Sequence, residues 1–325
     1  MRLLLVKTSS LGDLVHALPA LSDAARARAP LSCDWLVERA FAEIPAWHPA
    51  VVRTIACDLR GWRRTPLRGI FGDEWRRLRA ELRSQPYDLV LDAQGLIKSA
   101  WLAYQARGPR AGPDRYGARE PLAAIFYQRR YAVPSHERAH AVDRLRRLFA
   151  AALDYPLPQT PPDYGLKRDR FPAPGIAAPY ALLLHGTTWP SKRWRLACWQ
   201  DLGRWLAARG LRVALPWGND TERAEAQAIA ASCAGLVLPR LSLTELAGWI
   251  AHARVCVGVD TGLAHLAAAL GTPQVTLYGP TLPALTGAIG ANQYWLTSGD
   301  DQTIDRNRPN TVGVARVQET LASLL

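Results

Sequence analysis

Residues 255–265 read VCVGVDTGLAH, and this stretch decides the fold of the chain. Five apolar residues, three of them valine, predict a short buried β-strand. Asp260 ends the strand, and Thr261-Gly262 opens a stretch that is typical of a helix. A strand that leads directly into a helix is the repeating unit of α/β proteins, whose parallel strands are joined by helices.

The same unit recurs along the 325 residues. Short apolar runs predict strands at 2–6, 33–37, 51–56, 88–93, 180–185, 212–216, 255–260 and 274–278. Amphipathic stretches predict helices at 13–28, 73–83, 196–209, 221–232, 243–253 and 262–270. This alternation predicts parallel sheets with helices on both faces.

A proline-rich stretch divides the chain. Seven prolines lie between Asp154 and Tyr180, a density that excludes helix and central strand. We therefore predict an α/β protein of two Rossmann-like, doubly wound domains that face each other across a cleft, with ligands beyond the carboxyl ends of the strands. The predicted domains cover 1–160 and 180–310, with a linker over 161–179. A last helix covers 311–325, and its packing on the first domain is one option left open.

Positive charge is the unusual feature of the composition. The chain has 40 Lys+Arg and 28 Asp+Glu, a net charge of +12, and only four of the basic residues are Lys. This favours an anionic partner, which could be nucleic acid, a membrane surface or an acidic substrate. Eight arginines lie in the Arg60–Arg83 stripe. We interpret its helical part as a solvated face, and Arg60, Arg63 and Arg64 beside Trp62 as a binding cluster.

Cysteine usage and hydropathy predict the compartment. The five cysteines are scattered and never spaced as C-x-x-C, which favours buried thiols over disulfides or a zinc site. The first apolar run is cut by Lys7 and is too short for a signal peptide. No window reaches the roughly 18 apolar residues of a membrane span. We expect a cytoplasmic protein whose membrane contact, if any, is peripheral.

The turn after the first predicted strand, KTSSLGD at 7–13, is the first candidate site. It lacks both G-x-G-x-x-G and G-x-x-x-x-G-K-[ST], which disfavours dinucleotide and phosphate-loop proteins. Its backbone N–H groups open onto a helix and can receive an anion. Asp13 is either a capping residue or a general base that faces the cleft, and the residue types leave both readings open.

Two further turns carry polar groups in the second half. In HGTTWPSKRW, residues 185–194, two threonine hydroxyls and Lys192 could clamp a pyrophosphate, or form an ordinary polar loop. In DTGLAH, residues 260–265, the helix start favours a diphosphate, and Asp260 could accept sugar hydroxyls; incidental capping is the alternative. Glu222, in the first turn of a helix, is a candidate for ribose hydroxyls. Together these positions describe a nucleotide-diphosphate pocket.

The motifs lie in a known order. VKTSSLGDLVHALPALSDA at 6–24, HGTTWPSKRW at 185–194 and DTGLAH at 260–265 resemble glycosyltransferase family 9, the heptosyltransferases of GT-B fold, nearly from end to end. The resemblance implies inverting transfer of L-glycero-D-manno-heptose from ADP-heptose to the Kdo of Kdo2-lipid A. It therefore implies lipopolysaccharide core biosynthesis in a Gram-negative cell, at the cytoplasmic face of the inner membrane.

The resemblance also implies roles for residues of the first domain, which would bind the acceptor. Asp13 would be the general base. The implied acceptor-binding residues are Ser9, Ser10, Gly12, Arg60, Arg63 and Arg64. No metal or other cofactor and no nucleic acid is implied, while an anionic inner-leaflet surface is.

The second domain would bind the ADP-sugar. The residues implied for its diphosphate are Thr187, Thr188, Lys192, Thr261 and Gly262. Glu222 would bind ribose, and Leu241, where the family commonly has Met, would contact adenine. Asp260 and His265 would face the heptose.

Other functions remain as alternatives. The nearer one is an enzyme that adds the second heptose, or another ADP-sugar transferase. The remote one is a polyanion-binding protein that uses the Arg60–Arg83 stripe, for which a steep salt dependence would be expected.

Overall fold

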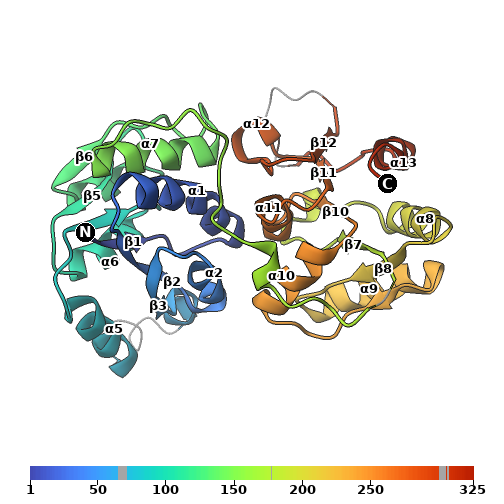
Figure 1. The fold of residues 1–325 in the computed structure, drawn as a ribbon, viewed down its shortest axis with the longest axis horizontal. Helices are drawn as coiled ribbons and strands as arrows, with labels where there is room; N and C mark the ends of the chain where they lie inside the picture. Colours follow the sequence, from blue (N-terminus) through green and yellow to red (C-terminus); the bar gives the residue numbers. More distant parts are fainter. Residues whose placement is uncertain (65–71, 177, 300–304, 306) are drawn as a thin grey trace. The chain divides into compact units, whose positions relative to one another are not determined.

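The computed structural model describes residues 1–64, 72–176, 178–299, 305 and 307–325. The chain divides into two compact units, Met1–Gly165 and Leu166–Leu325 (Figure 1). Each unit contains one six-stranded sheet in which every pair of neighbours is parallel, with helices between the strands. The predicted α/β fold class of two doubly wound domains is confirmed.

The sheet of the first unit has the strand order β3-β2-β1-β4-β5-β6. Its strands are β1 (Arg2–Val6), β2 (Ser32–Glu38), β3 (Val51–Cys57), β4 (Leu89–Asp92), β5 (Arg110–Pro113) and β6 (Arg129–Tyr131). The order reverses at β1, which pairs with both β2 and β4. Ligands of doubly wound sheets bind at such a switch point, beyond the carboxyl ends of the strands.

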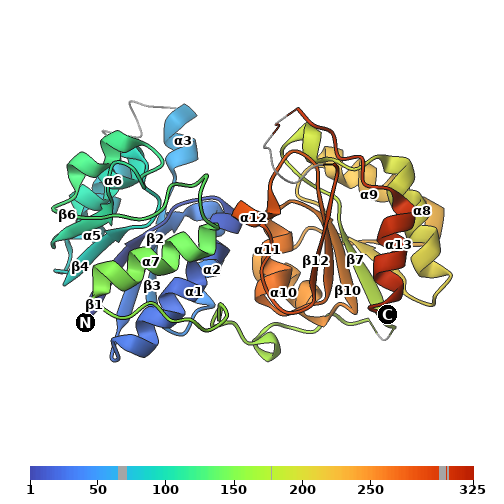
Figure 2. The ribbon, with the colours of Figure 1, turned by 90° about the horizontal axis from the view of Figure 1, so that it is seen from above.

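Helices cover both faces of this sheet (Figure 2). They are α1 (Leu11–Ala27), α2 (Glu43–Ala46), α3 (Leu59–Arg64), α5 (Asp73–Arg83), α6 (Ile97–Gln105) and α7 (Ala141–Leu153), with the 3₁₀ helices η1 (Arg39–Phe41) and η2 (Pro121–Phe126). On one face Leu78 of α5 and Leu102 of α6 share a buried core with Leu4 of β1. On the other face α1 packs against α7.

The second unit repeats the plan with the strand order β12-β11-β10-β7-β8-β9. Its strands are β7 (Tyr180–Leu184), β8 (Arg212–Leu215), β9 (Leu236–Val237), β10 (Val255–Val259), β11 (Gln274–Tyr278) and β12 (Gln293–Thr297). Its helices are η3 (Arg168–Arg170), η4 (Pro190–Lys192), α8 (Leu196–Ala207), α9 (Asp220–Cys233), α10 (Leu243–His252), α11 (Gly262–Ala269), α12 (Pro283–Thr286) and α13 (Val314–Ala322). Here the order reverses at β7, between β8 and β10.

The last helix belongs to the second unit. Val317 and Leu321 of α13 are fully buried in the core of that unit, and α13 packs against α8 and β11. The apolar spacing of Val314, Val317 and Leu321 gives the helix one apolar stripe, which packs in the core of the second unit. Packing of this helix on the first domain stays a prediction.

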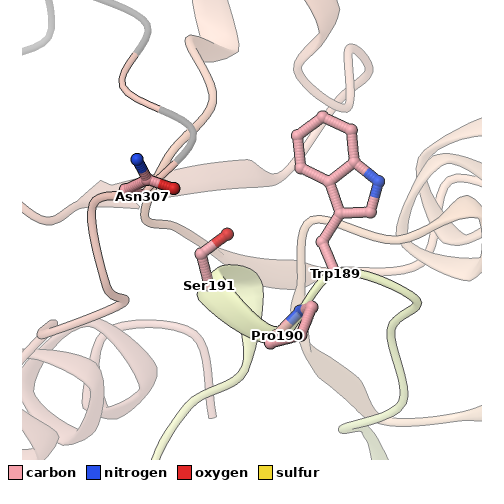
Figure 3. A pocket seen from close by; sticks show the side chains of 4 residues that line it. All are labelled: Trp189, Pro190, Ser191 and Asn307. Atoms are coloured by element: carbon pink, nitrogen blue, oxygen red, sulfur yellow. The ribbon is translucent and has the colours of Figure 1, made fainter.

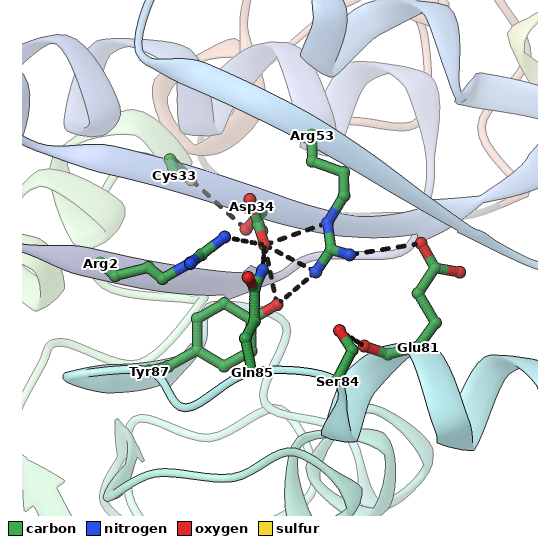
Figure 4. Close-up of polar contacts among 8 residues, drawn as sticks. All are labelled: Arg2, Cys33, Asp34, Arg53, Glu81, Ser84, Gln85 and Tyr87. Carbon is green, nitrogen blue, oxygen red and sulfur yellow. Dashed lines mark hydrogen bonds and ion pairs between the residues drawn. The ribbon is translucent and has the colours of Figure 1, made fainter.

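A buried carboxylate near the start of β2 joins several segments of the first unit through hydrogen bonds (Figure 4). Asp34 of β2 is fully buried, and its Oδ2 accepts hydrogen bonds from Arg53 Nη2 at 2.8 Å and Tyr87 Oη at 2.8 Å. Gln85 Nε2 donates to the same oxygen at 2.9 Å. Since these donors come from β3 and from the segment between α5 and β4, the cluster fixes β2 against elements far away in sequence.

We expect Asp34→Ala to lower the free energy of unfolding by about 2–4 kcal/mol, because it leaves the guanidinium of Arg53 without its buried partner. Arg147→Gln is the control, since it removes only the exposed ion pair with Asp143 on α7, for which about 0.5 kcal/mol or less is expected. Urea unfolding of both variants at pH 7 measures the difference. Equal losses in the two variants would contradict the role of the cluster.

Candidate active site

The turn after β1 is held by side chains of the protein itself. The backbone N–H groups of Thr8 and Ser9 donate to Gln94 Oε1 at 3.2 and 3.4 Å, and the N–H of Ser10 donates to Asp13 Oδ2 at 2.8 Å. The N–H groups of Ser9 and Ser10, expected to receive an anion, thus already have acceptors in this structure. Gly12, inside the first turn of α1, is buried.

Asp13 both caps α1 and sits beside cations. Its Oδ2 also accepts the hydroxyl of Ser10, at 3.1 Å, while no hydrogen bond to its Oδ1 is found among the described residues. Burial raises the pKa of Asp13, but the Lys7 cation, the Ser10 N–H and Arg119 outweigh it, so that the pKa lies below its usual value. The capping reading is therefore observed, and the general-base reading stays a prediction.

The charges of three cations act on this carboxylate. Lys7 is buried, donates from Nζ to the carbonyl of Ala93 at 3.1 Å, and has a pKa lowered by that burial. Arg144 of α7 donates to the carbonyl of Gly117 at 3.0 Å, and burial lowers its pKa too. Arg119, which acts on both Asp13 and Lys7, is exposed. Sequence reasoning missed all three as site residues, although Lys7 lies inside the first motif.

The backbone of Arg60 is linked to the turn after β1 through Glu38. The N–H of Arg60 donates to Glu38 Oε1 at 3.3 Å, and the N–H of Glu38 donates to the carbonyl of Thr8 at 3.0 Å. The guanidinium of Arg60 lies 5.1 Å from the ring centre of Phe41. The rest of the predicted cluster, the side chains of Arg63 and Arg64, lies outside the described residues, as does segment 65–71 of the stripe.

In the second unit Asp260 is the centre of a compact cluster. Lys192 Nζ lies 2.6 Å from Asp260 Oδ2, and His265 Nε2 lies 3.6 Å from Oδ1. The hydroxyl of Thr281 donates to Oδ2 at 2.7 Å. Burial raises the pKa of Asp260, but the hydrogen bond with His265 and the charge of Lys192 outweigh it and hold the pKa far below its usual value.

Local structure explains how these groups meet. Asp260 directly follows β10, Thr281 lies in the turn after β11, and the neighbouring parallel strands end at one edge. Thr261 is the N-cap of α11, which begins at Gly262. The positive end of that helix, beside the Lys192 cation, is suited to bind a diphosphate.

The η4 turn that carries Lys192 is anchored from the C-terminal segment. The N–H of Asn310 donates to the carbonyl of Ser191 at 3.1 Å, and Asn310 Nδ2 donates to the carbonyl of Lys192 at 3.3 Å. Lys192 Nζ also lies 4.8 Å from the ring centre of Trp189. A hollow beside this turn is lined by Trp189, Pro190, Ser191 and Asn307 (Figure 3). Of the preceding hydroxyl residues, Thr187 is buried and Thr188 is exposed.

Glu222 lies against the end of β7. Its Oε2 accepts the N–H of Gly218 at 2.8 Å, and a Cβ placed on Gly186 would lie only 2.7 Å from its Cδ. Gly186 thus lets the carboxylate approach the backbone between β7 and Lys192. Leu241 lies in the same unit, half-buried in the segment between β9 and α10.

Thr281 and Asn310 are the second unit's residues that sequence reasoning missed as site residues. Thr281 follows a strand at the predicted edge, which is a usable signal. Asn310 lies in a loop without periodicity, and only the fold shows that it contacts the η4 turn.

Within the described residues, no group of three or more His, Cys, Asp or Glu could hold a metal ion. In the same part of the chain, no helix is long and apolar enough to cross a membrane.

Transfer of a sugar from a nucleotide-sugar requires two groups: a base that deprotonates the acceptor hydroxyl and a cation that stabilises the leaving diphosphate. The whole chain superposes on E. coli heptosyltransferase WaaC with ADP at a TM-score of 0.92, with 41% identity and both chains covered in full. The same enzyme with ADP-2-deoxy-2-fluoro heptose gives a TM-score of 0.89, again at 41% identity with full coverage of both chains. The class is therefore that of a glycosyltransferase with the GT-B fold.

The particular family follows from the sequence comparisons. The family model for glycosyltransferase family 9 (heptosyltransferase) matches residues 75–315, and the chain belongs to this family. A Pseudomonas aeruginosa relative, lipopolysaccharide heptosyltransferase 1, is 54% identical over 300 residues, which cover 92% of this chain and 84% of the relative. The family expected from the three motifs is confirmed.

We expect Asp260→Asn to destabilise the protein most at neutral pH. Because the pKa of Asp260 is lower in the folded than in the unfolded protein, its ionised carboxylate stabilises the folded state when the pH is above the unfolded-state pKa of about 3.9. This stabilisation is lost as the pH falls through the folded-state pKa. Unfolding free energies should differ by about 1–3 kcal/mol at pH 7, with a smaller difference at about pH 3.

Asp201→Asn, on the exposed side of α8, is the control and should cost little at either pH. A difference between wild type and Asp260→Asn that stays constant from pH 7 to pH 3 would contradict the proposed ionisation.

Proposed function

We propose that this chain transfers L-glycero-D-manno-heptose from ADP-heptose to the Kdo of Kdo2-lipid A, with inversion at the anomeric carbon. The observation that carries the proposal is Asp13, an ionised carboxylate with one oxygen engaged by Ser10 and the other without a protein partner among the described residues. The relatives' names support heptose as the sugar, and one related structure contains an ADP-heptose analogue.

On the acceptor side, Asp13 Oδ1 takes the proton of the Kdo hydroxyl as its oxygen attacks the anomeric carbon. The bond from that carbon to the diphosphate breaks, and its electron pair leaves with ADP. A carboxylate with a low pKa suits this step, because the hydroxyl becomes acidic only as its bond to the oxocarbenium-like carbon forms. The base is then in its ionised form at neutral pH.

The acceptor carries carboxylates and phosphates, and the first unit offers cations to meet them. The charges of Lys7, Arg119 and Arg144 act on Asp13, and the backbone of Arg60 is joined to the same turn through Glu38. We include Ser9, Ser10, Gly12, Arg63 and Arg64 in this binding surface, as the family resemblance implies.

On the donor side, Lys192 and the N-terminus of α11 neutralise the charge that develops on the departing diphosphate. Thr187, Thr188, Thr261 and Gly262 complete the diphosphate site. In this proposal no metal is needed, since Lys192 supplies the positive charge. The ion pair with Asp260 at 2.6 Å positions Lys192 for this role.

The remaining donor residues follow the family resemblance. Glu222 binds the ribose, Leu241 contacts the adenine, and Asp260 and His265 face the heptose. Because the acceptor is a lipid, we place the enzyme in the cytoplasm, at the inner leaflet of the inner membrane, and the net charge of +12 suits that anionic surface.

Asp13→Asn should reduce kcat by about 10²–10⁴-fold, because the amide cannot accept the proton. The amide oxygen can still accept the N–H of Ser10, but loss of the charge that acts on buried Lys7 should lower the free energy of unfolding by about 1–3 kcal/mol. Steady-state kinetics and titration with an ADP-heptose analogue test this: donor affinity should stay near that of wild type. A loss of donor affinity as large as the loss of rate would show that Asp13 is not the base.

The acceptor decides between the first and the second heptosyltransferase. We expect turnover with ADP-heptose and de-acylated Kdo2-lipid A, because the Asp13 turn and its cations suit the bare Kdo. The comparison substrate is the same acceptor already carrying one heptose, with release of ADP as the measurement. Turnover of the heptosylated acceptor alone would assign the chain to the second transfer.

A further inference from the structure

The first unit exposes an apolar surface outside the candidate site. Ile97 and Tyr104 of α6 and Leu122 and Ile125 of η2 are 40, 54, 60 and 69% exposed, and we call them the α6–η2 patch. Of the eleven exposed large apolar side chains in the described residues, five lie between Ile97 and Ile125. Such a concentration is typical of an interaction surface, whereas single exposed apolar residues are common.

The backbone geometry of η2 directs these side chains outward. A 3₁₀ helix has three residues per turn, so Leu122 and Ile125 lie on one side of it. Between them Ala123 and Ala124 are buried and pack with Ala100 of α6 in a small core. Since small residues hold η2 closely against α6, the large ones are left on the outer side.

The two elements pack against each other next to the exposed side chains. The rings of Tyr104 and Phe126 meet edge to face, with centres 6.2 Å apart. The guanidinium of Arg110 lies 4.9 Å from the ring centre of Tyr104. The apolar surface therefore already has a cation at its border.

The charge around the patch identifies the partner. Residues 96–131 contain seven Arg or Lys and two Asp or Glu. Lys98, next to Ile97, and Arg129, four residues after Ile125, are both exposed. Apolar side chains bordered by cations fit the interface of an anionic bilayer, where the apolar groups enter the headgroup region and the cations meet lipid phosphates.

The patch is connected to the Asp13 turn through hydrogen bonds. The N–H of Ile97 donates to Glu120 Oε2 at 2.7 Å, and the N–H of Glu120 donates to the carbonyl of Gly95 at 3.0 Å. The neighbouring Gln94 accepts from Thr8, in the turn that leads to Asp13. A lipid surface on the patch would thus lie beside the acceptor turn.

We propose that the α6–η2 patch docks this chain on an anionic lipid surface, with Leu122 and Ile125 inserted among the headgroups and Lys98 and Arg129 on lipid phosphates. The benefit for a lipid-borne acceptor rests on the proposed function, but binding to the lipid surface does not.

The test is co-sedimentation of the full chain with vesicles of phosphatidylcholine that contain about one-third phosphatidylglycerol. Leu122→Ser/Ile125→Ser should weaken the partition constant roughly tenfold or more, and Lys98→Gln/Arg129→Gln about tenfold. Val52→Ser is the matched control: Val52, on β3, is 69% exposed like Ile125, and its substitution should leave binding unchanged. Wild type should bind pure phosphatidylcholine vesicles far more weakly, and added salt should release it from the anionic ones.

Three outcomes would overturn the proposal: unchanged vesicle binding by Leu122→Ser/Ile125→Ser, equal binding of wild type to neutral vesicles, or a wild-type dimer that this double variant dissociates without loss of vesicle binding. The last outcome would assign the patch to self-association. Turnover of the double variant on de-acylated acceptor should equal that of wild type, because no bilayer is involved. That assay separates failure of docking from failure of the proposed activity.

Discussion

The parallel register of β1 with its two neighbours is the constraint on which the first site depends. Val6 pairs with Leu36 of β2 on one side and with Asp92 of β4 on the other. Lys7 directly after β1, Glu38 at the end of β2 and Gln94 after β4 must therefore lie at one edge of the sheet. Because β1 from Leu3 to Val6 is fully buried, polar groups of this strand can reach the site only past its end.

Each unit has an ionised, partly or fully buried carboxylate at this edge of its sheet. The two carboxylates differ in how many of their oxygens are already engaged by protein groups. Asp260 has one oxygen on the Lys192 cation and the Thr281 hydroxyl and the other 3.6 Å from His265 Nε2, so it can orient groups but is poorly placed to take a proton. Asp13 uses one oxygen for Ser10 and keeps the other. This difference, rather than residue type, distinguishes a proposed base from an orienting residue.

The sequence predicts those parts of the site that are contiguous in the chain. The turns at Asp13 and Asp260 each follow an apolar strand and open a helix, so that strand, turn and helix could all be located from short stretches. Asn310 and Arg119 could not be assigned in this way, because each approaches the site only after distant segments pack together, whereas Thr281 follows a predicted strand at the same edge. Nor could residue type decide whether Asp13 caps a helix or acts as a base, since one carboxylate can do both. Strands β5 and β6 were missed because they are short, and because one contains Pro113 and the other is mostly polar.

The cations of the first unit have two opposing effects on the proposed reaction: they weaken Asp13 as a base, and they attract the anionic acceptor. Lys7 and Arg119 lower the pKa of Asp13, which keeps the carboxylate ionised but makes it a weaker base. On the proposed function, the same cations attract the carboxylate and phosphates of the acceptor. An acceptor anion that pairs with Arg119 would weaken the positive field at Asp13 and raise the pKa of its carboxyl toward the usual value. Acceptor binding would then itself strengthen the base, at the moment when the hydroxyl that it must deprotonate is in place.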